Sequence, residues 1–181
     1  MKTTFRELIT FIKKPSLTHK SGNSNTFTVF LHIFILSILT GMFFGPILSL
    51  IQEMGWVDME NHAMKELMEK TSKLTVFALA VIAAPIIEEL IFRAPLTLFK
   101  KPLAFKIGFY FLTIAFGLVH LSNFEITNNV IYFAPILVAP QIVLGGYLGF
   151  IRVKFGLLYS ILLHAAYNAF FILGTFAADL M

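Results

Sequence analysis

The sequence contains no cysteine and few charged residues. Without a thiol the chain can form no disulfide, no thiolate zinc site and no cysteine nucleophile, so any hydrolytic chemistry must come from carboxylate, imidazole, hydroxyl or amide groups. Only 13% of the 181 residues are charged, against about 25% in soluble proteins. A further 57% are hydrophobic, and the mean hydropathy is +0.82. These values exclude an ordinary soluble domain and indicate a membrane protein.

The N-terminal region has no features of a removable signal peptide. Its first 26 residues are polar and basic, and no short apolar core with a small-residue cleavage site follows them. The first apolar run extends from Phe27 to Ile51, which exceeds the ~20 residues that a membrane-spanning helix needs. We therefore expect a basic N-terminal segment over residues 1–26, followed by a retained membrane anchor.

Apolar runs separated by polar breaks predict an all-α fold with about five transmembrane helices. The expected spans are residues 27–51, 74–99, 103–121, 130–151 and 155–177. No internal repeat and no low-complexity segment is present in the sequence. We expect residues 27–181 to form a single membrane-embedded domain, a polytopic helical bundle.

Positive charge is concentrated in alternate connections between these spans. Of the 14 lysines and arginines, 11 lie in residues 1–26, 93–106 and 152–154, and the other three lie in the linker of residues 52–73. The positive-inside rule therefore predicts a cytoplasmic N-terminus and a C-terminus outside. We expect a multi-pass protein of the cell membrane, surrounded by the lipid bilayer. Because the charge follows the topology, no nucleic-acid partner is expected.

The linker of residues 52–73 is rich in acidic residues. We expect it to form an exposed, partly amphipathic helix at the outer surface. Its apolar side would consist of Met59, Met64, Leu67 and Met68. We interpret it as a solvated connection, with contact to a substrate as the alternative.

Two adjacent glutamates, Glu88 and Glu89, lie inside the second apolar run. A charged group near the bilayer centre costs at least ~2.5 to 3.5 kcal/mol, so a carboxylate there needs a reason. Neighbouring residues on a helix point about 100° apart, which gives the two side chains different surroundings. Glu89 precedes Arg93 by four residues, the favourable order for a helical ion pair. Glu88 has no such partner and is the better candidate for a general base or acid.

Two histidines and an asparagine add polar groups to the apolar runs. His120 lies near the end of the third span, at a depth similar to that of Glu88 if the two spans form an antiparallel hairpin. His164 and Asn168 are four residues apart in the last span and therefore share one helix face. Alone, each position would be interpreted as a hydrogen bond between helices. Together with Glu88, they are the groups that hydrolysis by an activated water requires.

Two forms of this chemistry remain open. In the first, Glu88 and His120 polarise the water, while His164 and Asn168 donate hydrogen bonds to the oxyanion. In the second, Glu88, His120 and His164 bind a zinc ion that activates the water. The sequence has no His-Glu-x-x-His run. We therefore favour the form without a metal or other cofactor and keep Zn²⁺ as the alternative.

The order of these motifs resembles that of the CPBP family of intramembrane proteases, which includes CAAX prenyl proteases and Abi-type bacteriocin-immunity proteins. Glu88 to Arg93 is similar to the family motif EExxxR. Phe116 to His120 is similar to FxxxH, and His164 to Asn168 is similar to HxxxN. The resemblance covers about residues 74–177, which would be the CPBP-like core of the chain.

The resemblance implies a role for each matching residue. In the family, the first glutamate and the histidine of the second motif activate water, which corresponds to Glu88 and His120. The histidine and asparagine of the third motif stabilise the oxyanion, which corresponds to His164 and Asn168. The remaining motif residues, Glu89 and Arg93, would support these catalytic residues.

We therefore expect an intramembrane endopeptidase that acts on a peptide or membrane-protein substrate in a water-filled cavity. The first alternative is a non-catalytic bacteriocin-immunity or membrane interaction protein, in which the polar groups only hold helices together. The second is a proton- or ion-coupled carrier with Glu88 as its relay.

Overall fold

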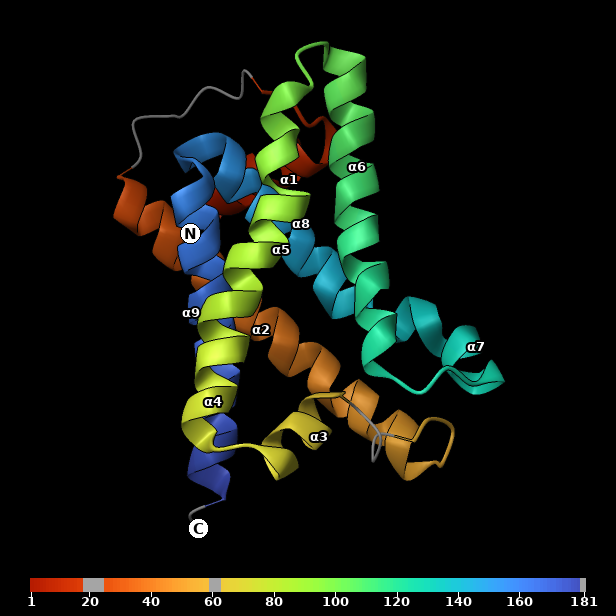
Figure 1. Ribbon diagram of the computed structural model, residues 1–181. Coiled ribbons are helices and arrows are strands. Elements are labelled where there is room, and N and C mark those ends of the chain that lie inside the picture. The colour runs from red at the N-terminus through yellow and green to blue at the C-terminus, as the bar shows by residue number, and fades with distance from the viewer. Residues whose placement is uncertain (18–24, 59–62, 180–181) are drawn as a thin grey trace.

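The computed structural model describes residues 1–17, 25–58 and 63–179 as helices joined by short connections (Figure 1). The expected all-α class is confirmed, since these residues contain no strand. The α-helices are α1 (Lys2–Lys13), α2 (Thr26–Glu53), α3 (Ala63–Lys70), α4 (Lys73–Phe77), α5 (Ala84–Phe92), α6 (Pro102–Val119), α7 (Asn128–Leu137), α8 (Ala139–Phe155) and α9 (Leu157–Ala178). A π segment, η1 (Ala78–Ala83), joins α4 to α5, and two 3₁₀ segments, η2 (Ala94–Leu98) and η3 (His120–Asn123), follow α5 and α6.

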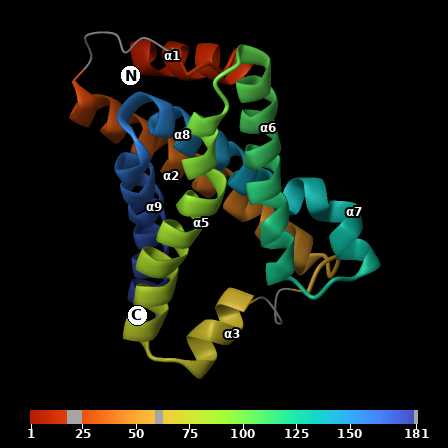
Figure 2. The ribbon, with the colours of Figure 1, turned by 45° about the horizontal axis from the view of Figure 1, so that its top comes forward.

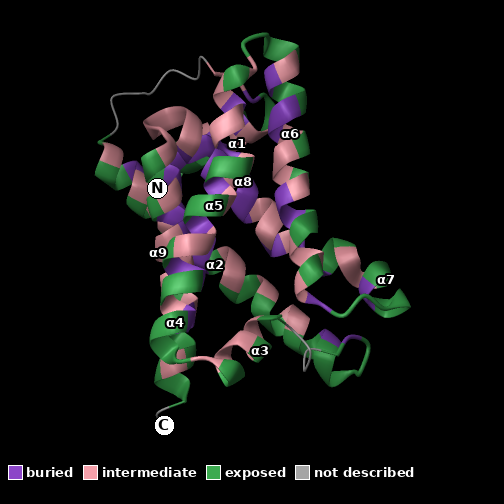
Figure 3. Cartoon of the chain, viewed as in Figure 1, coloured by how far each residue is buried: buried purple, intermediate pink, exposed green. Residues whose placement is uncertain are grey.

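Five helical stretches of the described residues are long and apolar enough to cross a membrane. They are Thr26–Glu53, Lys73–Leu98, Pro102–Asn123, Asn128–Phe155 and Leu157–Ala178. The predicted spans are confirmed, because each predicted end lies within four residues of an observed one. Many large apolar side chains on the outer surfaces of these helices are exposed, as a lipid environment allows (Figure 3).

α8 is the central helix, and it packs against α1, α2, α6 and α9. Small residues allow α6 to approach it closely. A Cβ atom at Gly149 of α8 would lie 2.6 Å from Cε2 of Phe109 on α6. Likewise, a Cβ at Gly117 of α6 would collide with Cγ1 of Ile142 on α8. Glycine at these two positions therefore sets the distance between α6 and α8.

The basic N-terminal segment contributes a helix to the core. Leu8 and Phe11 of α1 are buried, and the Phe11 ring makes edge contacts with two core phenylalanines of α6 and α8. Oγ1 of Thr4 forms a 2.9 Å hydrogen bond with Nδ1 of His32 on α2. Thr4, Leu8 and Phe11 follow helical spacing, which explains why one face of this polar segment is buried.

The expected amphipathic helix of the linker is present as α3. Its apolar residues Met64, Leu67 and Met68 pack against a small cluster formed by α4, η1 and α9. Met59, which was assigned to the same apolar side, lies outside the described residues. α7 lies on the other side of the bundle from α9 (Figure 2). There its Phe133 stacks on Trp56, which follows α2.

The α6–α8 contact predicts the effect of one added methyl group. Gly149→Ala should lower the free energy of unfolding by about 1 to 3 kcal/mol, because the methyl collides with the buried Phe109 ring. Gly174→Ala is the matched control, since a Cβ there meets nothing within 4 Å. Thermal unfolding of both purified variants in detergent would measure the difference. Equal midpoints for the two variants would contradict the packing described for α6 and α8.

Candidate active site

The second span is widened just before the glutamates. The N–H of Ala84 donates to the carbonyl of Leu79, five residues earlier, as in a π turn. The next bond of this kind would join residue 85 to Ala80, but Pro85 has no N–H. Nδ2 of Asn168 on α9 donates to the Ala80 carbonyl instead, at 2.8 Å. Asn168 thus satisfies a carbonyl that proline leaves free, and one of its two amide hydrogens is used there.

Glu89 is fully buried and has three side-chain partners. Ser160 Oγ donates a hydrogen bond to its Oε2, Arg93 Nε lies 3.8 Å from that oxygen, and His164 Nδ1 lies 3.1 Å from Oε1. The expected ion pair between Glu89 and Arg93 is therefore present. The contacts with Ser160 and His164 were not predicted. Because a carboxylate only accepts hydrogen bonds, the contact with Glu89 assigns a proton to Nδ1 of His164.

Arg93 is held mainly by charge and by an aromatic ring. Its side chain is only 1% exposed, and its guanidinium carbon lies 4.1 Å from the centre of the Phe116 ring. Among the described residues, none of its side-chain nitrogens has a hydrogen-bond partner. A Cβ at Gly145 would lie 3.1 Å from Nη2 of Arg93. Glu89 and the Phe116 ring therefore provide the compensation that a buried cation needs.

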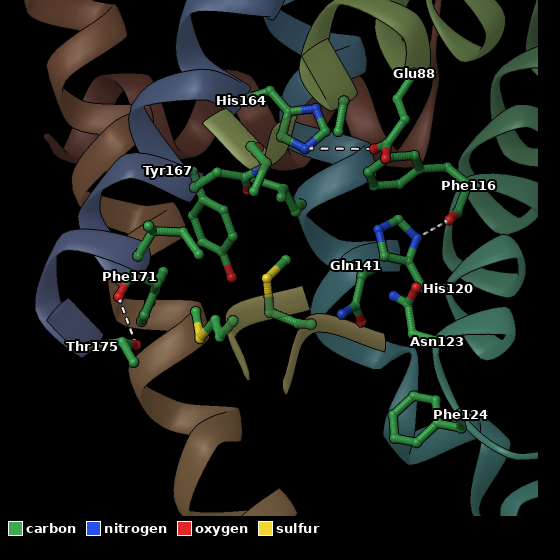
Figure 4. Close-up of a pocket in the computed structure, with 17 residues that line it drawn as sticks. Glu88, Phe116, His120, Asn123, Phe124, Gln141, His164, Tyr167, Phe171 and Thr175 are labelled. Atoms are coloured by element: carbon green, nitrogen blue, oxygen red, sulfur yellow. Dashed lines mark hydrogen bonds and ion pairs between the residues drawn. The ribbon is translucent and has the colours of Figure 1, made fainter. Parts of the chain in front are cut away.

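His164 lies between the two glutamates. Its Nδ1 faces Glu89, and its Nε2 lies 3.7 Å from Oε2 of Glu88 (Figure 4). Whereas Glu89 is fully buried, the Glu88 side chain is 25% exposed. The adjacent glutamates therefore have different surroundings, as their 100° separation predicted. Glu89 lies behind His164, and Glu88 lies in front of it, at the surface of a cavity.

His120 is also fixed by a hydrogen bond of its Nδ1. This atom lies 2.7 Å from the carbonyl oxygen of Phe116, one turn earlier. A carbonyl oxygen only accepts, so Nδ1 carries the proton and Nε2 of the neutral ring is left with its lone pair. An imidazole in this form can accept a hydrogen bond from water. His120 begins η3, directly after α6, so its depth is set by the end of that helix.

One cavity of about 450 Å³ brings the predicted site residues together. Glu88, His120, His164 and Asn168 all line it. Gln141, which the sequence indicated as a packing or inter-helix hydrogen-bonding residue rather than a site residue, lines the same cavity and lies beside His120 (Figure 4). Its Oε1 is buried and has no hydrogen-bond partner among the described residues. A glutamine in an apolar span was the only signal for this residue in the sequence.

The zinc alternative required three ligands at one point. Glu88, His120 and His164 line the same cavity. Within the described part of the chain, however, no three His, Asp or Glu side chains are grouped in a way that could hold a metal ion.

A comparison with family models identifies the family of this chain. The model described as type II CAAX prenyl endopeptidase Rce1-like matches residues 70–170, more than half of the sequence. The protein belongs to this family, which confirms the resemblance inferred from the motifs. All three motifs lie within the matched residues. Neither a curated protein nor a solved structure matches the chain.

The buried network predicts that substituting Glu89 destabilises the protein much more than substituting Glu88. Glu89→Gln should lower the free energy of unfolding by about 3 to 5 kcal/mol, because it leaves Arg93 as an uncompensated buried cation. Glu88→Gln should change it by much less, since Glu88 is partly exposed. Thermal unfolding in detergent of the two variants beside the unmodified protein would measure both effects. A Glu88→Gln variant that is the less stable of the two would contradict the assignment.

Proposed function

We propose that this member of the CAAX prenyl endopeptidase-like family hydrolyses peptide bonds within the membrane. The observation that carries the proposal is the convergence of Glu88, His120 and His164 on one cavity, with each histidine fixed through its Nδ1 atom. A carboxylate, a neutral imidazole acceptor and a second imidazole are the groups needed to activate a water and stabilise an oxyanion.

The first step is attack by a water held between Glu88 and His120. Nε2 of His120 accepts one hydrogen bond from this water, and the Glu88 carboxylate accepts the other. As the water oxygen bonds to the carbonyl carbon of the substrate, its proton passes to Glu88. When the carbon–nitrogen bond breaks, Glu88 returns that proton to the leaving nitrogen. The products are a carboxylic acid and an amine, and the protein is unchanged.

The second requirement is stabilisation of the tetrahedral oxyanion. Nδ1–H of His164 already donates to Glu89. For Nε2 to donate to the oxyanion as well, His164 must carry both protons, and the Glu89 carboxylate balances the resulting charge. The second amide hydrogen of Asn168 is the other donor. With His164 protonated, the charges of Arg93 and His164 balance those of the two glutamates.

Gln141 supplies a contact for the substrate backbone. An unpartnered buried carbonyl is unfavourable by roughly 1 to 3 kcal/mol, and a backbone N–H of a bound peptide would satisfy it. The cavity wall also includes Met64, Met68, Phe171 and Ile172. The site therefore suits a peptide in extended form with apolar side chains near the bond that is cut.

The direct test compares the N-termini of membrane peptides in cells that carry the unmodified protein or Glu88→Gln at equal levels. We expect new N-termini with the unmodified protein and their loss, by about 10²-fold or more, with the variant, because the general base is absent. Glu53→Gln, an exposed glutamate at the end of α2, is the matched control and should retain them. Identical profiles for all three proteins would reject hydrolysis and favour the non-catalytic interaction protein.

A second test addresses Gln141, using a synthetic peptide that spans a cleavage site found in the first experiment. Gln141→Leu should raise KM roughly fivefold, the effect of losing one hydrogen bond, and leave kcat nearly unchanged. Gln52→Leu, an exposed glutamine of α2, is the control. A fall in kcat with unchanged KM would show that Gln141 does not bind the substrate backbone in the manner proposed.

A further inference from the structure

We infer that the cavity is entered from the extracytoplasmic face of the membrane and that its occupant is an apolar polypeptide segment presented on that side. The identity of the occupant as a substrate rests on the proposed function, whereas the side of entry rests on geometry and charge alone.

One end of the cavity is closed by fully buried side chains. His164 is 2% exposed, and the Phe116 ring beside it is completely buried. Behind them lie Glu89 and Arg93. Beyond those lie buried residues of the main core, which include Leu96 of η2 and phenylalanines of α6 and α8. A polypeptide cannot reach His164 from this direction without unfolding the core.

The opposite end of the cavity is open. Along α9 the lining residues change from the buried His164, through the half-buried Tyr167 and Phe171, to the exposed Thr175. Eleven residues separate His164 from Thr175, which corresponds to about 16 Å along the helix. The lining also includes Met64 and Met68 of α3, which lies at the same end of the bundle as the C-terminus (Figure 1).

Basic residues gather at the closed end. Exposed lysines flank the turn before α6 and the end of α1, namely Lys13, Lys14, Lys100, Lys101 and Lys106. Arg152 of α8 donates to the backbone carbonyl of Arg93 near the same turn. Figures 1 and 2 show α1 and the start of α6 at the end of the bundle away from α3. The positive-inside rule assigns this closed end to the cytoplasm, so the open end faces the other side.

The composition of the open end identifies the occupant. Met64, Met68, Phe171 and Ile172 present apolar surface, and methionine adapts to side chains of different shape. Gln141, whose carbonyl can bind a backbone N–H, lies beside His120 in the same cavity (Figure 4). We therefore assign the cavity to an apolar segment of an exported peptide, or of the extracytoplasmic part of a membrane protein. Segments that remain in the cytoplasm are excluded.

The side of entry can be tested by labelling single-cysteine variants with a thiol reagent. Because the sequence has no cysteine, the unmodified protein gives no background. Thr175→Cys places a thiol at the open end, and Ala84→Cys places one in the cavity wall, one turn before Glu88. Thr3→Cys on α1 marks the basic end and keeps every charge. Ile82→Cys is the matched control for depth, since Ile82 is exposed on the same span but does not line the cavity.

Each variant is treated with a membrane-impermeant maleimide in intact cells and again after permeabilisation. We expect Thr175→Cys and Ala84→Cys to be labelled in intact cells, and Thr3→Cys only after permeabilisation. Ile82→Cys should react at least about tenfold more slowly than Ala84→Cys, because maleimide attacks the thiolate, which does not form against lipid.

Labelling of Thr3→Cys in intact cells would overturn the inference, and so would labelling of Ala84→Cys only after permeabilisation. Neither readout depends on hydrolysis. A protein that is labelled as expected but generates no new N-termini would therefore retain the entry side and lose the proposed function.

Discussion

The arrangement of the site depends on one buried carboxylate, that of Glu89. A carboxylate in a low-dielectric interior must be paired and hydrogen-bonded, and Glu89 obtains its partners from two spans: Arg93 from its own, and Ser160 and His164 from α9. Ser160 Oγ also lies 3.0 Å from the Leu148 carbonyl oxygen of α8, so its single hydroxyl hydrogen is shared between the two acceptors and the network extends to the central helix. Such a network contributes less through net stability than through orientation. Its consequence is that Nε2 of His164 points to Glu88 rather than into the core.

The functional side of the site follows from the adjacent position of Glu88. Because successive helical residues diverge by about 100°, fixing Glu89 in the core turns Glu88 toward the cavity. The π segment and the hydrogen bond from Asn168 to Ala80 set the rotation of this helix relative to α9. Glycines of α6 and α8 then bring the end of α6, with His120, against the same cavity. The candidate catalytic groups thus come from three spans, and His120, His164 and Asn168 are each oriented by a partner outside the reacting set.

Much of this architecture is local enough to be predicted from sequence. Span length gives the five membrane spans, and spacing of four residues gives the Glu89–Arg93 pair. Contacts between distant residues were not predictable: His164 lies 75 positions from Glu89, and spacing along one helix cannot show which residue of another it meets. The bond of Asn168 to Ala80 depends on a π turn that no residue pattern indicated. The burial of Leu8 and Phe11 was visible as helical spacing but was obscured by the surrounding lysines.

The central claim is that Glu89 holds His164 with a proton on Nδ1 while the neutral ring of His120 keeps its lone pair on Nε2. Nitrogen NMR of the protein labelled in its histidines distinguishes these forms directly, and substitution of each of the five histidines in turn assigns the signals. We predict a protonated Nδ1 at both residues, with the His164 signal lost from that form in Glu89→Gln and the His120 signal unaffected. A His164 ring protonated only at Nε2, or one indifferent to Glu89→Gln, would contradict the account.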